Sequence, residues 1–133
     1  MNTTTDAVTG PPRVWLRLEG LATLVVAIFL FERGGHSWAL FALLFLAPDA
    51  SFGGYLLGPR AGAWIYNAAH SYVGPLVLAV VFVATGRPPV LAIIWAGHIG
   101  FDRALGYGLK YPTAFQDTHL GRIGRTREAR PAG

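Results

Sequence analysis

The stretch Trp95-Ala-Gly-His98-Ile-Gly-Phe-Asp102-Arg103-Ala-Leu-Gly106 is an apolar segment interrupted by three ionisable side chains. Residues four apart in an α-helix lie on the same face. The imidazole of His98 and the carboxylate of Asp102 are therefore expected side by side, where they can share one proton or one metal ion.

The composition indicates a membrane protein. Of its 133 residues, 53% are hydrophobic and only 14% are charged, whereas about a quarter of the residues in a soluble domain are charged. The absence of cysteine excludes disulfides, iron–sulfur clusters and thiolate zinc sites, which leaves His, Asp, Glu and Asn as metal ligands. Most of the net charge of +4 falls on membrane flanks and the tail, so the expected partner is anionic lipid and not nucleic acid.

Four apolar segments are long enough to cross a hydrocarbon core of about 30 Å. We predict an all-α, integral membrane four-helix bundle over residues 13–106, with spans at about 14–31, 38–57, 61–85 and 90–106. A disordered leader over residues 1–12 would precede it, and a cytoplasmic loop and basic tail over residues 107–133 would follow. Pro48 lacks an amide donor, so Asp49 is expected at a kink or at a new helical start.

The basic residues set the expected orientation. Four spans place both termini on one side, together with the turn at residues 58–60. That side carries nine of the eleven basic residues: Arg13, Arg17, Arg60, Arg103, Lys110, Arg122, Arg125, Arg127 and Arg130. The positive-inside rule therefore predicts cytoplasmic termini.

The ionisable side chains within the spans fall at similar depths. At 1.5 Å per residue from the cytoplasmic end, Asp102 lies roughly 6 Å deep, Glu19 roughly 8 Å, and Asp49, His70 and His98 roughly 12–14 Å. All five are expected in the same half of the bilayer. Because a charge at the centre of a span costs about 2.5–3.5 kcal/mol on insertion scales, these groups must pair, bind a cofactor or line water.

One interpretation is a structural polar network. Glu19 or Asp49 would neutralise Arg103, while the polar stripe of the third span and His98 would satisfy one another by hydrogen bonds. That stripe contains Asn67, His70 and Ser71. The protein would then be a non-catalytic bundle whose polar core fixes helix packing or a partner interface.

The other interpretation is a metal site. Two imidazoles and two carboxylates at similar depth suit zinc, manganese or iron, and a bound divalent ion can lower the pKa of a water molecule enough to make a nucleophile. His70 and His98 could instead be axial haem ligands, although the nearby acids disfavour so apolar a cofactor. Proton or ion translocation through the same acids would require a homo-oligomer, because four spans are few for such a pathway.

Several motifs together resemble the small bacterial membrane family called domain of unknown function 4260. They are Arg17-Leu-Glu19-Gly-Leu, Pro48-Asp49, Asn67-x-x-His70-Ser71, and His98-Ile-Gly-Phe-Asp102-Arg103 followed by Gly106-Tyr-Gly-Leu-Lys-Tyr-Pro-Thr-Ala-Phe-x-Asp-Thr-His-Leu-Gly-Arg. The resemblance covers roughly residues 13 to 125 and implies a multi-pass protein of the bacterial inner membrane, without an established activity.

The order Pro-Asp, His-Ser and His-x-x-x-Asp is also similar to the inner-membrane, metal-dependent hydrolases associated with LexA binding. That similarity implies a metal held by Asp49, His70, His98 and Asp102, and membrane-bound hydrolysis of a lipid-linked or phosphate-bearing substrate. We expect these four residues to be the ligands or their direct partners. Glu19 and Asn67 would lie just outside them, and Arg103 would be a counter-ion or anion binder.

Overall fold

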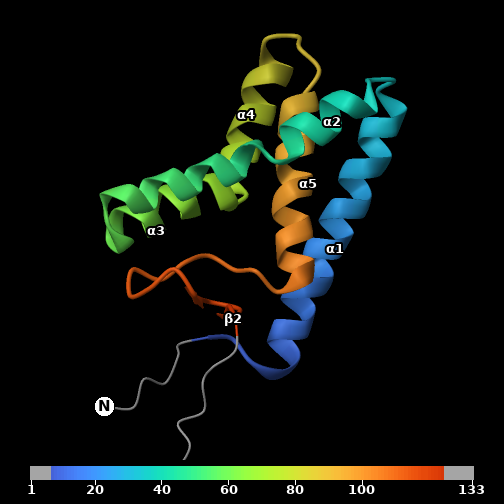
Figure 1. Cartoon of the computed structure of the whole chain (residues 1–133). Helices are drawn as coiled ribbons and strands as arrows, with labels where there is room; N and C mark the ends of the chain where they lie inside the picture. Colours follow the sequence, from blue (N-terminus) through green and yellow to red (C-terminus); the bar gives the residue numbers. More distant parts are fainter. Residues whose placement is uncertain (1–6, 125–133) are drawn as a thin grey trace, which may run out of the picture.

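The computed structural model describes residues 7–124. The chain is mainly helical, with a 3-10 helix (η1) after the second α-helix and one small β-hairpin near its C-terminal end (Figure 1). In chain order the elements are α1 (Gly10–Arg33), α2 (Trp38–Phe45), η1 (Ala47–Leu57), α3 (Pro59–His70), α4 (Val73–Ala84), α5 (Val90–Leu105), β1 (Asp117–Thr118) and β2 (Gly121–Arg122).

Helices α1 and α5 lie side by side and run in opposite directions (Figure 1). Glycines make their close approach possible. A Cβ atom at Gly100 would lie 2.6 Å from the carbonyl oxygen of Gly20, and a Cβ atom at Gly20 would overlap the side chain of Arg103. Small residues that allow backbones to approach in this way are typical of helix pairs in membranes. Helix α4 packs against the same helix, α5.

Helices η1 and α3 form a second unit, which we call the η1–α3 hairpin. Pro48 is the second residue of η1, and α2 stops at Phe45 because the proline ring cannot continue a helix. Gly58 turns the chain with a φ of 106°, and Pro59 opens α3. The two helices approach closely where Gly62 faces Tyr55 and Gly54 faces Ile65.

Residues 107–122 cross beneath the η1–α3 hairpin, and we call this segment the strap (Figure 1). Its two strands pair antiparallel, with Asp117 opposite Arg122. The amide of Val8 donates to the carbonyl of His119 at 2.7 Å, and Arg13 Nε donates to the carbonyl of Leu120 at 2.7 Å. These bonds tie the strap to the start of α1.

Two helical segments, Gly10–Arg33 and Trp38–Leu57, are long and apolar enough to cross a membrane, and α3 with α4 would make a third if that bent pair is one span. Large apolar side chains such as Phe29 (58% exposed) and Leu43 (73% exposed) line the outside of the protein. An exposed apolar surface of this extent suggests a membrane protein.

The helices differ from the expected four straight spans. The predicted span 61–85 is two helices that meet at Ser71 and Tyr72 with a bend of 44°. A four-helix bundle is not confirmed, because α5 packs on α1 and α4 while η1 packs on α3. Of the predicted leader, residues 10–12 belong to α1 and residues 1–6 lie outside the described part, as do residues 125–133 of the predicted tail.

Candidate metal centre

The four residues predicted as ligands converge from three elements. Asp49 lies in the first turn of η1, His70 is the last residue of α3, and His98 and Asp102 stand one turn apart on α5. Each offers one ligand atom, and these four atoms all lie within 4.8 Å of one another. Both imidazoles are buried, whereas the side chain of Asp102 is 15% exposed and that of Asp49 is 36% exposed.

The contacts within the cluster are short and nearly equal. The two Nε2 atoms of His70 and His98 are 3.2 Å apart. Asp49 Oδ1 lies 3.3 Å from His70 Nε2 and 3.2 Å from His98 Nε2. Asp102 Oδ2 lies 3.6 Å from His70 Nε2 and 3.3 Å from His98 Nε2. Five of the six distances among the four atoms therefore lie between 3.2 and 3.6 Å, and the sixth, between the two carboxylate oxygens, is within 4.8 Å.

That range matches tetrahedral zinc. Zinc bonds to imidazole nitrogen and carboxylate oxygen are about 2.0–2.1 Å long, and a regular tetrahedron with such bonds has edges of about 3.3–3.4 Å. Five of the six distances that a tetrahedral zinc site needs are thus already in place, and an approach of the two carboxylate oxygens to the same separation would complete it. The two carboxylates would balance the charge of the zinc ion.

Hydrogen bonds alone explain the cluster poorly. The Nδ1 atom of His70 lies 3.0 Å from the carbonyl oxygen of Tyr66, to which it can donate. A neutral His70 then presents only the lone pair of Nε2 to the cluster. With both imidazoles neutral and both carboxylates ionised, the only remaining imidazole proton is that of His98, and one proton cannot satisfy all five close contacts. A cation at the centre would satisfy all of them.

The surroundings of the two imidazoles differ. His70 stacks on the ring of Tyr66, with centroids 3.8 Å apart, and its bond to the Tyr66 carbonyl fixes which nitrogen faces the cluster. The ring of Phe45 meets His98 edge-on. His98 Nδ1 is buried, and among the described residues it has no hydrogen-bond partner at ordinary geometry. The carbonyl of Phe45 is an acceptor in its vicinity. A small movement of α2 would supply the partner that a ligating imidazole needs.

Arg103, Asn67 and Glu19, which we predicted around the ligands, take different positions. Arg103 is buried and donates to the carbonyls of His70 (3.1 Å) and Tyr107 (3.3 Å), so it holds the backbone of a candidate ligand. Asn67 does not contact the four ligand atoms and binds the backbone of Lys110. Glu19 is exposed on α1, because Gly20 is the residue that faces α5.

Lys110 is a neighbour of the site that the sequence did not reveal. Its side chain is buried, and Nζ donates to the carbonyl of Phe115 at 2.7 Å. The ammonium lies 3.8 Å from the ring centroid of Phe115 and 5.0 Å from that of Tyr66. Burial lowers the pKa of Lys110 to about 8, and the charge of Asp102 partly opposes this shift.

A comparison with protein-family models identifies the family of this chain. Residues 13–123 match the family described as Domain of unknown function (DUF4260). The chain belongs to this family. The matched region of the DUF4260 protein extends from α1 to β2 and includes all four residues of the cluster. No curated protein and no solved structure matches the chain, and the similarity to the LexA-associated hydrolases is not shown.

Proposed function

We propose that this DUF4260 protein binds one divalent metal ion, zinc, through Asp49, His70, His98 and Asp102. The observation that supports the proposal is the convergence of two nitrogens and two oxygens, with five of the six distances among them at 3.2–3.6 Å and all four atoms within 4.8 Å of one another. Manganese and iron prefer more ligands than the four that this cluster offers, so the geometry favours zinc over both.

The ion would join two parts of the fold. Two ligands, Asp49 and His70, come from the η1–α3 hairpin, and two, His98 and Asp102, come from α5. Four protein ligands fill a tetrahedral site, which is typical of structural zinc, whereas catalytic zinc keeps a position for water. We therefore propose a structural metal in a polar core that fixes helix packing.

Hydrolysis is the second candidate function. It is favoured by the exposure of Asp49, whose side chain is 36% exposed and is thus the ligand that water could most easily displace. In that case the site would act on a lipid-linked or phosphate-bearing substrate. An activity that survives or rises in Asp49→Ala would support this candidate, because the variant opens a coordination position.

We also propose how the chain sits in a membrane. It would be a multi-pass protein of the bacterial inner membrane that crosses the bilayer four times, with both termini and the strap on the cytoplasmic side. The clustering of basic residues on that side supports this orientation, and these residues would meet anionic headgroups. Tagging each terminus with a reporter that is active only in the cytoplasm would test the proposed orientation.

The metal content of the purified protein tests the central proposal. The wild type and His98→Ala would be purified in detergent, freed of any affinity tag, and analysed for metals. We expect close to one zinc ion per wild-type chain and almost none in the variant. A wild type that stays metal-free after incubation with zinc, manganese and iron would refute the metal site. The cluster would then be explained as a polar network that holds no ion.

A further inference from the structure

The candidate ligands are divided between two parts of the fold whose backbones make few contacts with each other. The hairpin, which carries Asp49 and His70, packs mainly within itself, and α5, which carries His98 and Asp102, packs on α1 and α4. Backbone contacts between the hairpin and α5 are sparse by comparison.

Two side chains of α5 do reach the end of α3: Trp95 Nε1 donates to the carbonyl of Ala69 at 2.6 Å, and Arg103 donates to that of His70 at 3.1 Å. Since a metal site needs its ligands placed to within a fraction of an ångström, a further link that fixes the hairpin would sharpen this placement.

Asn67 links the hairpin to the strap through both ends of its side-chain amide. Its Oδ1 accepts from the amide of Lys110 at 2.6 Å, and its Nδ2 donates to the carbonyl of the same residue at 2.8 Å. The side chain thus pairs with one residue of the strap as a neighbouring β-strand would. We call this pair of hydrogen bonds the clasp. Asn67 lies three residues before His70, about one turn earlier on α3.

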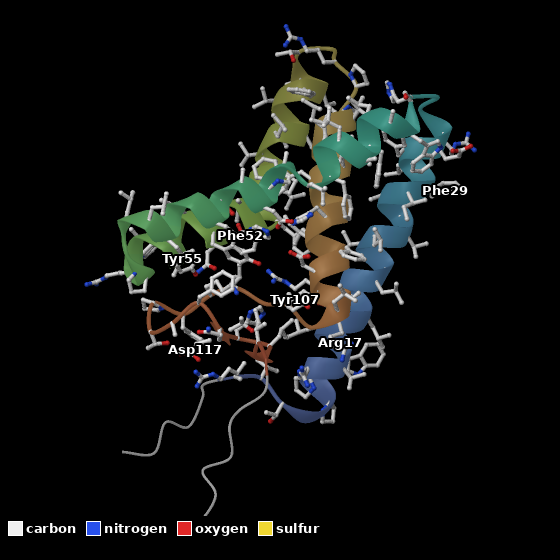
Figure 2. The ribbon with its side chains drawn as sticks, in the orientation of Figure 1. Arg17, Phe29, Phe52, Tyr55, Tyr107 and Asp117 are labelled. Atoms are coloured by element: carbon white, nitrogen blue, oxygen red, sulfur yellow. The ribbon has the colours of Figure 1, made fainter. Side chains whose placement is uncertain are left out.

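Further contacts bring the strap against the same hairpin. The ring of Phe115 packs on Phe52 and Tyr55 of η1, with centroids 5.4 and 5.1 Å apart, and both of these residues lie on the side of the hairpin near the strap (Figure 2). On the α5 side, Arg103 bridges the carbonyls of Tyr107 and His70. The strap therefore contacts each element that supplies a ligand.

We propose that Asn67 is a positioning residue of the metal centre, which fixes the hairpin against α5 by clasping the strap at Lys110. The inference rests on the proposed zinc site. Its consequence is that zinc affinity depends on two hydrogen bonds that touch none of the four ligands. Coupling between sites is reciprocal, so zinc must in turn stabilise the clasp.

Zinc affinity measured by competition with a chelator tests the first half of this coupling. Asn67→Ala should bind zinc about tenfold more weakly than the wild type, the lower end of the effect of losing a partner beyond the ligands. Thr113→Val is the matched control. It removes the 2.6 Å bond between Thr113 and Asp117 within the strap, leaves the clasp intact, and should keep wild-type affinity.

Hydrogen exchange of the wild type with and without zinc tests the second half, and this comparison needs no variant; His98→Ala serves as its control. Zinc should slow exchange at the Lys110 amide in the wild type and leave it unchanged in His98→Ala. The inference is overturned if the wild type binds zinc but Asn67→Ala binds it equally well, if Thr113→Val loses as much affinity, or if zinc leaves the strap's exchange unchanged. A wild type that binds no zinc would instead refute the metal site itself, and this inference with it.

Discussion

Replacing His98 with alanine should abolish the stabilisation of this protein by zinc. A ligand that binds only the folded state adds about 2.7 kcal/mol to the free energy of unfolding when its free concentration is 100 times its Kd. At an unfolding entropy of about 2.1 cal/mol/K per residue, this chain length converts that gain into a rise of about 10 °C in Tm. Without the imidazole, two carboxylates and His70 remain, and the tetrahedron is incomplete.

The assay is thermal unfolding in detergent, with zinc buffered at a fixed free concentration. His36→Ala is the matched control, because His36 lies in the turn between α1 and α2, packs on Phe31 and takes no part in the cluster. The control should keep the full zinc-dependent rise in Tm. Equal rises in the wild type and His98→Ala would refute the assignment, and loss of the rise in His36→Ala would show that zinc binds elsewhere.

Three further predictions follow from the same structure. Lys110 has a pKa of about 8 in the folded protein and 10.5 in the unfolded chain, so the unfolded chain binds more protons between pH 8 and 10.5. The free energy of unfolding should therefore rise by about 3 kcal/mol over this pH range. The pH dependence should vanish in Lys110→Met. Gly100→Ala should lower the free energy of unfolding by about 1–3 kcal/mol because its Cβ meets the Gly20 carbonyl, whereas Gly53→Ala, with open space around it, should not. Zinc affinity, measured by competition titration, should fall below about pH 6 because protons then compete with zinc for imidazole. An affinity that is unchanged at pH 5 would exclude histidine ligands.

The cluster was largely predictable from the sequence because it depends on regular geometry. The i, i+4 spacing of His98 and Asp102 predicts a shared face, and their atoms lie 3.3 Å apart. Counting residues along each span placed Asp49 and His70 at the same depth as His98, and the structure brings all three together. Helical rise fixes depth, so no knowledge of packing was needed for this step.

Direction around a helix was not predictable in the same way. Glu19 shares the depth of the cluster but points away from it, because the close approach of α1 to α5 requires Gly20 at the contact. The break at Ser71 and the pairing of Asn67 with Lys110 were also missed. The clasp joins residues 43 positions apart, and no local pattern records such a contact.

X-ray absorption at the zinc edge of the loaded protein would test the central claim most directly. We expect four nitrogen and oxygen neighbours at about 2.0 Å, with the outer-shell scattering of two imidazoles, because five of the six distances among the four ligand atoms already match a tetrahedron of that size. A shell of six oxygens, or scattering from fewer than two imidazoles, would contradict a site built from Asp49, His70, His98 and Asp102.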